Sequence, residues 1–183
     1  MTATRWIFTG LVLCVTLQMQ AQKYEQEARI RASEMPAAAL TYLEKNYPGQ
    51  RRTRHYMEHS RQGQEAKLTL YFESKFKSAG YRYSVKFDSL GQLYDVERII
   101  KSDQLPSPAR HSIHEDLGAS FQHFRIEKIQ ERYLPTGSLA GYELEVRGKR
   151  GEVVGYFELQ YGPGGQRLSL EPVEQDSNPF FFF

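Results

Sequence analysis

Residues 87–97, FDSLGQLYDVE, describe a turn between two strands, and the chain repeats that layout at residues 161–171, YGPGGQRLSLE. In both stretches an aromatic residue precedes a short glycine-containing segment, and polar and apolar residues alternate after it. This pattern is typical of a tight connection between antiparallel strands. The repetition predicts that the chain contains one structural unit twice.

Strands are predicted on both sides of the first turn. Polar and apolar side chains alternate in residues 68–76 and again in residues 81–88. Alternation with a period of two is expected where one face of a sheet is buried and the other is not. With further strands predicted at residues 52–59 and 92–100, the first unit contains four antiparallel strands.

A helix is predicted before each set of strands. In residues 35–49, MPAAALTYLEKNYPG, the helix begins near Pro36 and is stopped by Pro48 and Gly49. A second helix begins near Ser107 and Pro108, after a segment rich in Pro and Ser. Its apolar stripe consists of Ala109, Ile113, Leu117 and Phe121.

Strands return after the second helix, at residues 124–132, 142–147, 153–161 and 167–174. The order of one helix and four strands therefore occurs twice. We predict an α+β fold made of two repeats, each with one helix on a four-stranded antiparallel sheet, at residues 35–101 and 102–175. Both helices would lie on one face, and the sheets could join into one continuous sheet, which would remove two exposed edges.

The N-terminal segment predicts export. Residues 1–22 carry an early cation at Arg5, an apolar core and a cleavage position at Ala21, as in a secretory signal peptide. Cys14 is the single cysteine of the chain and lies in this segment, so lipid anchoring through Cys14 is the alternative. A mature chain without cysteine favours the bacterial periplasm or cell surface over disulfide-rich secretion. Residues 23–34 are charged, and we expect a lead-in to the first helix or a linker.

Three short motifs resemble a known family. They are NYPG at residues 46–49, YSVKFD at residues 83–88 and GQLYDVE at residues 91–97. They are similar to the PepSY-like, β-lactamase-inhibitor-protein-like (BLIP-like) tandem domains of secreted bacterial proteins. The resemblance implies a helix packed on a four-stranded sheet, and it implies binding of secreted enzymes by the open face of that sheet. The second repeat departs from the pattern, with DLGASF at residues 116–121, and no inhibitory residue can be carried over.

The outward positions of the predicted strands form a candidate binding surface. The simpler interpretation is a solvated face held together by cross-strand ion pairs. The functional interpretation is a protein-binding face, because Tyr and Arg are typical interface anchors. The residues of this face are Tyr71, Glu73, Lys75, Arg82, Lys86, Glu143, Glu145, Arg147, Tyr156 and Glu158.

Two further features have alternative interpretations. His55, Met57 and His59 share one side of a predicted strand and are ligand types that copper accepts. The tail at residues 176–183 ends in Phe180, Phe181, Phe182 and Phe183, which would either pack on the fold or be recognised by a partner.

The sequence predicts a non-catalytic exported module that binds protein. The predicted mature chain contains no cysteine and no serine in a GxSxG motif, so the sequence gives no indication of nucleophilic catalysis. We expect no cofactor. The net charge of +2, with both signs mixed along the chain, gives no reason to expect nucleic acid. The expected partner is another envelope or secreted protein, or a peptide, and the module would act as an inhibitor or a sensor accessory. We expect no transmembrane segment in the mature chain. The alternative is a periplasmic metal-binding protein that uses His55, Met57 and His59.

Overall fold

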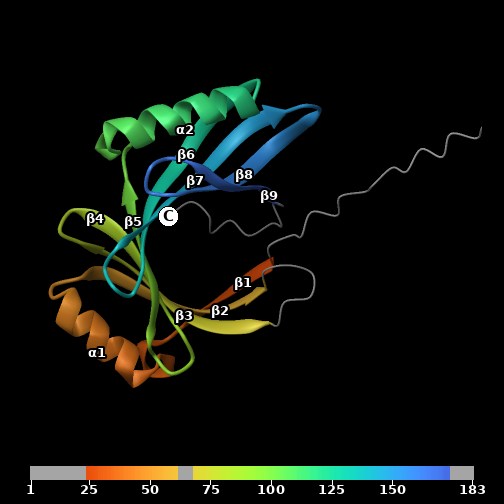
Figure 1. Ribbon diagram of the computed structural model, residues 1–183. Coiled ribbons are helices and arrows are strands. Elements are labelled where there is room, and N and C mark those ends of the chain that lie inside the picture. Colours follow the sequence, from red (N-terminus) through yellow and green to blue (C-terminus); the bar gives the residue numbers. More distant parts are fainter. Residues whose placement is uncertain (1–23, 62–67, 174–183) are drawn as a thin grey trace, which may run out of the picture.

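The computed structural model describes residues 24–61 and 68–173. These residues form an α+β fold with two α-helices and a single nine-stranded antiparallel sheet (Figure 1). The strands lie in sequence order from β1 to β9, so each strand pairs with the next one along the chain. The predicted signal peptide and the predicted aromatic tail lie outside the described residues.

The strands agree closely with the predicted segments except at the N-terminus. The elements are β1 (Tyr24–Ile30), α1 (Ala37–Asn46), β2 (Arg51–Arg61), β3 (Thr69–Ser78), β4 (Tyr81–Phe87), β5 (Leu93–Ile100), α2 (Ser107–Ser120), β6 (His123–Tyr133), β7 (Leu139–Arg150), β8 (Val153–Tyr161) and β9 (Arg167–Val173). Short 3-10 helices, η1 (Ala32–Glu34) and η2 (Ser102–Gln104), precede the two α-helices.

One strand was not predicted. Residues 24–30, which we expected to be a lead-in or linker, form β1 and pair antiparallel with β2. The segment is an edge strand, and among its described side chains, at residues 26–30, only Ile30 packs against the apolar core. A strand that buries so little apolar area shows little hydrophobic alternation, which explains why the pattern missed it.

The sheet is continuous, as the prediction allowed, and it is one sheet rather than two four-stranded sheets. The connection is made by β5 and β6, which pair from Val96 and Tyr133 to Ile100 and Ile129. Pairing these strands removes the two free edges that separate sheets would have exposed.

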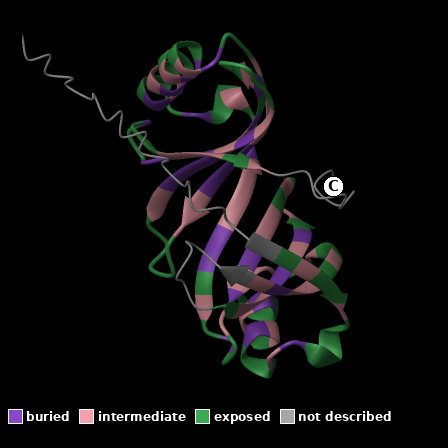
Figure 2. Cartoon of the chain, turned by 90° about the vertical axis from the view of Figure 1, so that its right-hand side faces the viewer, coloured by how far each residue is buried: buried purple, intermediate pink, exposed green. Residues whose placement is uncertain are grey.

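Both helices cover the same face of the sheet (Figure 1). Against β3, β4 and β5, α1 buries Ala39 and Leu43 in a first core. A second core forms where α2 packs Ile113 and Leu117 over β6, β7 and β8. Figure 2 shows buried residues along the strands and exposed residues on the outward turns of the helices. No helix in the described part of the chain is long and apolar enough to cross a membrane.

The two quoted turns have the same geometry. Gly91 donates its backbone N–H to Asp88, and Gly165 donates to Gly162, at 3.0 and 2.9 Å. Both glycines have positive φ, 78° and 86°, a conformation that side chains disfavour. The backbone conformation of the turns is therefore by itself sufficient reason for glycine at both positions.

Each turn also contacts the helix of its own half. A Cβ on Gly91 would lie 2.9 Å from the backbone nitrogen of Ala39 in α1. A Cβ on Gly165 would lie 2.7 Å from the carbonyl oxygen of Ala109 in α2. Both contacts are closer than side chains tolerate, so the glycines let the helices approach the sheet.

Candidate binding face

All ten sequence-predicted surface residues lie on the face of the sheet opposite the helices, which we call the open face. The register establishes this, because directly paired residues share a face. Glu73 pairs with Lys86 on β3 and β4, and Arg147 pairs with Tyr156 on β7 and β8. The same face runs through the middle of the sheet, where Gln130 of β6 pairs with Glu143 of β7.

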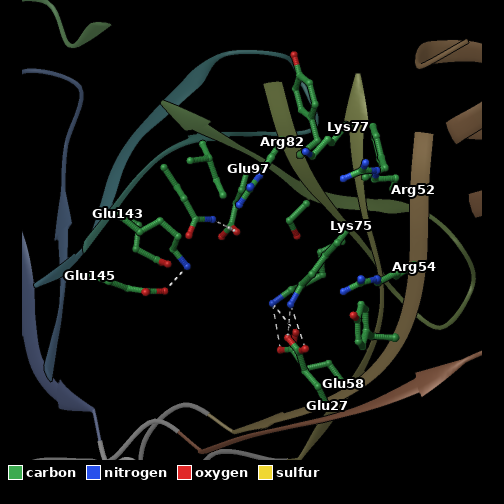
Figure 3. A pocket seen from close by; sticks show the side chains of 18 of the residues that line it. Glu27, Arg52, Arg54, Glu58, Lys75, Lys77, Arg82, Glu97, Glu143 and Glu145 are labelled. Carbon is green, nitrogen blue, oxygen red and sulfur yellow. Dashed lines mark hydrogen bonds and ion pairs between the residues drawn. The ribbon is translucent and has the colours of Figure 1, made fainter. Parts of the chain in front are cut away.

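The open face is hollowed by a pocket of about 330 Å³. Figure 3 shows side chains from strands in both halves of the sheet pointing toward one another across this space. Six of the predicted residues line the pocket, namely Lys75, Arg82, Lys86, Glu143, Glu145 and Glu158. The others that line it are Glu27, Arg52, Arg54, Tyr56, Glu58, Phe76, Lys77, Tyr83, Ser84, Glu97, Ile99, Lys128 and Gln130.

One side of the pocket contains a compact ion cluster. Lys75 Nζ lies 2.8 Å from Glu27 Oε1 and 3.0 Å from Glu73 Oε2. Lys86 Nζ lies 2.8 Å from Glu58 Oε2. Glu58 and Glu73 are only 2% and 4% exposed, so their charges are compensated inside the protein rather than by water.

Burial and neighbouring charges act in opposite directions on these carboxyl groups. Burial tends to raise the pKa of Glu73, but the ammonium groups of Lys75 and Lys86 and a hydrogen bond from Ser84 hold it below the usual value. Glu27 has a pKa raised to about 7, first by burial and then by the nearby charge of Glu73. Glu73 is thus the stable anion of the cluster, and Glu27 takes up a proton first as pH falls.

Carboxylates of this cluster could in principle hold a cation. Oxygen atoms of Glu27, Glu58 and Glu73 lie within 4.8 Å of one another. However, Lys75 and Lys86 already supply positive charge to the same oxygens. The arrangement is therefore that of an ion-pair network.

A second network lies at the centre of the sheet. Gln130 donates a hydrogen bond from Nε2 to Glu97 Oε2, and Arg132 Nη2 lies 3.2 Å from Asp95 Oδ2. Burial, followed by the charges of Glu143 and Asp95, raises the pKa of Glu97 to about 8. Gln130 Oε1 accepts no hydrogen bond from the residues described and lies at the pocket. The oxygen itself is buried, with less than 1 Å² of accessible surface.

Acidic side chains dominate the far side of the pocket. On neighbouring strands β7 and β8, Glu145 lies directly opposite Glu158. Lys128 of β6 forms an ion pair with Glu145. Part of this negative charge is therefore neutralised within the face.

Exposed cations gather at the opposite side. Lys77 of β3 pairs directly with Arg82 of β4, and Arg52 lies beside them at the start of β2 (Figure 3). In the described part of the chain, these three side chains form no ion pair and no hydrogen bond. We call Arg52, Lys77 and Arg82 the basic patch.

Tyrosines flank the pocket. Tyr71 packs on Tyr94 with ring centroids 4.6 Å apart, and Lys86 lies 5.6 Å from the centre of the Tyr71 ring. In the other half, the guanidinium of Arg147 lies 5.9 Å from the centre of the Tyr156 ring. Tyr94 is 47% exposed, which makes this pair accessible to a partner.

The histidines singled out from the sequence lie on the other face. His55, Met57 and His59 share one side of β2 and are half-buried, as the alternation predicts. The ring nitrogen Nδ1 of His55 lies 2.8 Å from Ser74 Oγ, and burial lowers the pKa of His55. A metal would have to compete with this hydrogen bond.

Sequence analysis missed every pocket residue on β1, β2, β5 and β6. The alternation of β5 is broken between Leu93 and Asp95, where its register against β4 shifts, and that of β6 is broken between Ile126 and Lys128. A bulge shifts the two-residue period, so the outward set can no longer be counted from the apolar positions. For β2, the alternating polar residues on either side of Tyr56 were the available signal.

The fold and this polar face define a class of protein: an open antiparallel sheet, helices on one face only, and a concave charged surface on the other. The sequence matches no protein-family model and no curated protein. Solved structures share the fold.

A BLIP-like protein from Bacteroides fragilis is 18% identical, with a TM-score of 0.55 over 79% of this chain and 92% of its own. A DUF2874 family protein from Bacteroides uniformis is 16% identical, with a TM-score of 0.56 over 80% and 95%. A candidate periplasmic protein from Bacteroides eggerthii is 14% identical, with a TM-score of 0.57 over 78% and 92%. The fold is BLIP-like, as the sequence resemblance implied.

Proposed function

We propose that the chain is a non-catalytic exported module that binds another envelope or secreted protein, or a peptide, through the open face. The observation that carries this proposal is that the face is hollowed by a pocket and is not covered by either described helix. A surface that is merely solvated has no need of a pocket of about 330 Å³, which is within the range of ligand sites.

The chemistry of the face fits a protein partner. Tyrosines at both ends supply rigid apolar area with a polar tip, and Tyr71 and Tyr156 are half-buried side chains next to cations. Buried ion pairs fix the shape of the surface between them, which reduces the entropy lost on binding.

We propose that the fold arose by duplication of one unit. The equivalent contacts of Gly91 with Ala39 and of Gly165 with Ala109 support this. So do matching caps before the helices, where Arg31 N donates to Glu34 and Lys101 N donates to Gln104, each at 2.8 Å. In this proposal β1 and β5 are equivalent strands, and each unit begins one strand earlier than the sequence indicated.

We also propose that the chain is exported to the periplasm or the cell surface. Residues 1–22 have the layout of a signal peptide, and one structural neighbour is a candidate periplasmic protein. Both support export to the periplasm or cell surface. The choice between an inhibitor and a sensor accessory depends on the partner.

Affinity capture from a bacterial envelope extract tests the proposal. Purified protein is compared with the double variant Tyr71→Ala, Tyr156→Ala and with a control, His111→Ala, Glu115→Ala. The control side chains are 77% and 70% exposed on α2, away from the open face. We expect a partner that the wild type and the control retain and the tyrosine variant loses. Equal retention by all three proteins would refute binding through the open face.

Metal binding is the second candidate, favoured by the shared side of His55, Met57 and His59 on β2. A titration with copper, measured by isothermal calorimetry, tests this candidate. The proposal requires stoichiometric binding that disappears in the double variant His55→Ala, His59→Ala. Binding that persists in this variant would exclude these ligands.

A further inference from the structure

We propose that the segment of the partner that enters the open face is acidic and that the basic patch receives its carboxylates. This inference rests on the proposed function and adds the chemistry of the partner. It follows from where positive charge is left uncompensated on the face.

The three cations are close neighbours by register. Lys77 and Arg82 are a direct cross-strand pair of β3 and β4, and the bulge at the start of β2 places Arg52 beside them (Figure 3). Like charges in directly opposed positions repel and destabilise a sheet. Retaining such an arrangement is consistent with an anionic group that binds between them.

The neighbouring carboxylates are committed elsewhere. Glu27 and Glu73 bind Lys75, and Glu145 binds Lys128. Over the residues described, no carboxylate lies within 4.0 Å of a nitrogen of Arg52, Lys77 or Arg82. The internal pairing therefore leaves the excess positive charge at one side of the pocket.

The backbone presents one of these cations in a strained conformation. Arg52 has φ of 57°, in the left-handed region, at the β-bulge between Arg51 and Arg54. A bulge of this kind redirects a side chain out of the regular alternation. Here it brings Arg52 to the pocket, which Arg52 lines together with Lys77 and Arg82.

An acidic peptide segment fits this surface better than a small anion. The cations come from β2, β3 and β4, so positive charge is spread across three strands. The patch also continues into a pocket that is larger than one anion needs. An extended segment places every second side chain on one side, so that alternating carboxylates reach successive cations.

Fluorescence anisotropy tests the inference directly. The probe is a fluorescein-labelled peptide of alternating Glu and Tyr, and its comparison peptide has Gln in place of Glu. The full chain is compared with the variant Lys77→Gln, Arg82→Gln and with a control, Lys45→Gln, Arg150→Gln, which loses the same charge from exposed positions outside the pocket.

We expect the wild-type protein to bind the Glu peptide, and to bind the Gln peptide more weakly. The patch variant should bind the Glu peptide with about tenfold lower affinity, whereas the control variant should bind it like the wild type. Added salt should weaken the Glu peptide selectively. Three results would overturn the inference: no binding, equal binding of the two peptides, or equal losses in the patch variant and the control. Displacement of the peptide by inorganic phosphate at matched ionic strength would also overturn it, since the patch would then be a small-anion site.

The capture experiment separates this inference from the proposed function. A partner that is lost with Tyr71→Ala, Tyr156→Ala but retained fully by Lys77→Gln, Arg82→Gln would uphold the binding face and reject the acidic segment. If both variants still retain the partner, the binding face itself is rejected.

Discussion

Lys77 and Arg82 lie directly opposite each other on β3 and β4, although both carry a positive charge. On the same two strands, Glu73 and Lys86 instead form a direct pair of opposite charges. A surface selected for stability alone would pair Lys77 with an acid. The pairing of Lys77 with Arg82 is therefore expected to lower the stability of the unbound protein.

Replacing one of these cations should stabilise the fold. We expect Arg82→Gln to raise the free energy of unfolding by about 0.2–1 kcal/mol at low ionic strength, because it removes a like-charge cross-strand pair. The gain should shrink as salt screens the repulsion. Urea unfolding at two salt concentrations measures it, with Lys45→Gln as the control. A loss of stability in Arg82→Gln would show that Arg82 has a stabilising partner.

The pH dependence of stability should contain a contribution from Glu97. Its pKa is raised from 4.5 to about 8 in the folded protein, first by burial. The folded state therefore holds this proton more tightly than the unfolded chain does. The resulting stabilisation is complete below pH 4.5 and is lost as pH rises through about 8.

The variant Glu97→Gln isolates that contribution. We expect its stability relative to wild type to increase as pH rises from about 5 to about 9, because the variant has no charge to bury. His55, whose pKa is lowered, contributes to the pH dependence of stability in the opposite direction. This contribution is the same in both proteins, so it cancels in the difference between their stabilities. Thermal unfolding across this range is the measurement, and a difference that does not change with pH would contradict the account.

The glycine turns test whether the close contact between turn and helix contributes to the requirement for glycine. We expect Gly165→Ala to cost more than Gly80→Ala, because both positions have positive φ but only Gly165 lies against a helix. The difference should be about 1–3 kcal/mol, the usual cost of overpacking. Denaturant unfolding of both variants provides the comparison. Equal losses would show that backbone conformation alone explains the glycine.

The sequence predicted those parts of the fold that depend on local patterns. Alternation identified eight of the nine strands and assigned Tyr71 and Glu145 to the correct face. It failed at β1, whose described side chains form almost no apolar face, and it did not identify the outward residues of β5 and β6, where bulges interrupt the period. The ion network could not be predicted, because it depends on the register between distant strands.

The same limit applies to the candidate site. Lys77 lies one residue beyond the segment 68–76 whose alternation was recognised, and its charge carries information only beside Arg82 and without a nearby acid. That combination is a property of the folded sheet. The sequence predicted which residues point outward on several strands, but it could not predict which of the charged residues lack an ion-pair partner.

Site-specific photocrosslinking in the bacterial envelope tests the central claim most directly. A p-benzoylphenylalanine at Tyr156 lies on the open face, and one at His111 lies on the outside of α2. If the open face binds the partner, irradiation gives a specific adduct from position 156 and none from position 111. An adduct from position 111 alone would show that the partner binds the helical side and would contradict the proposed function.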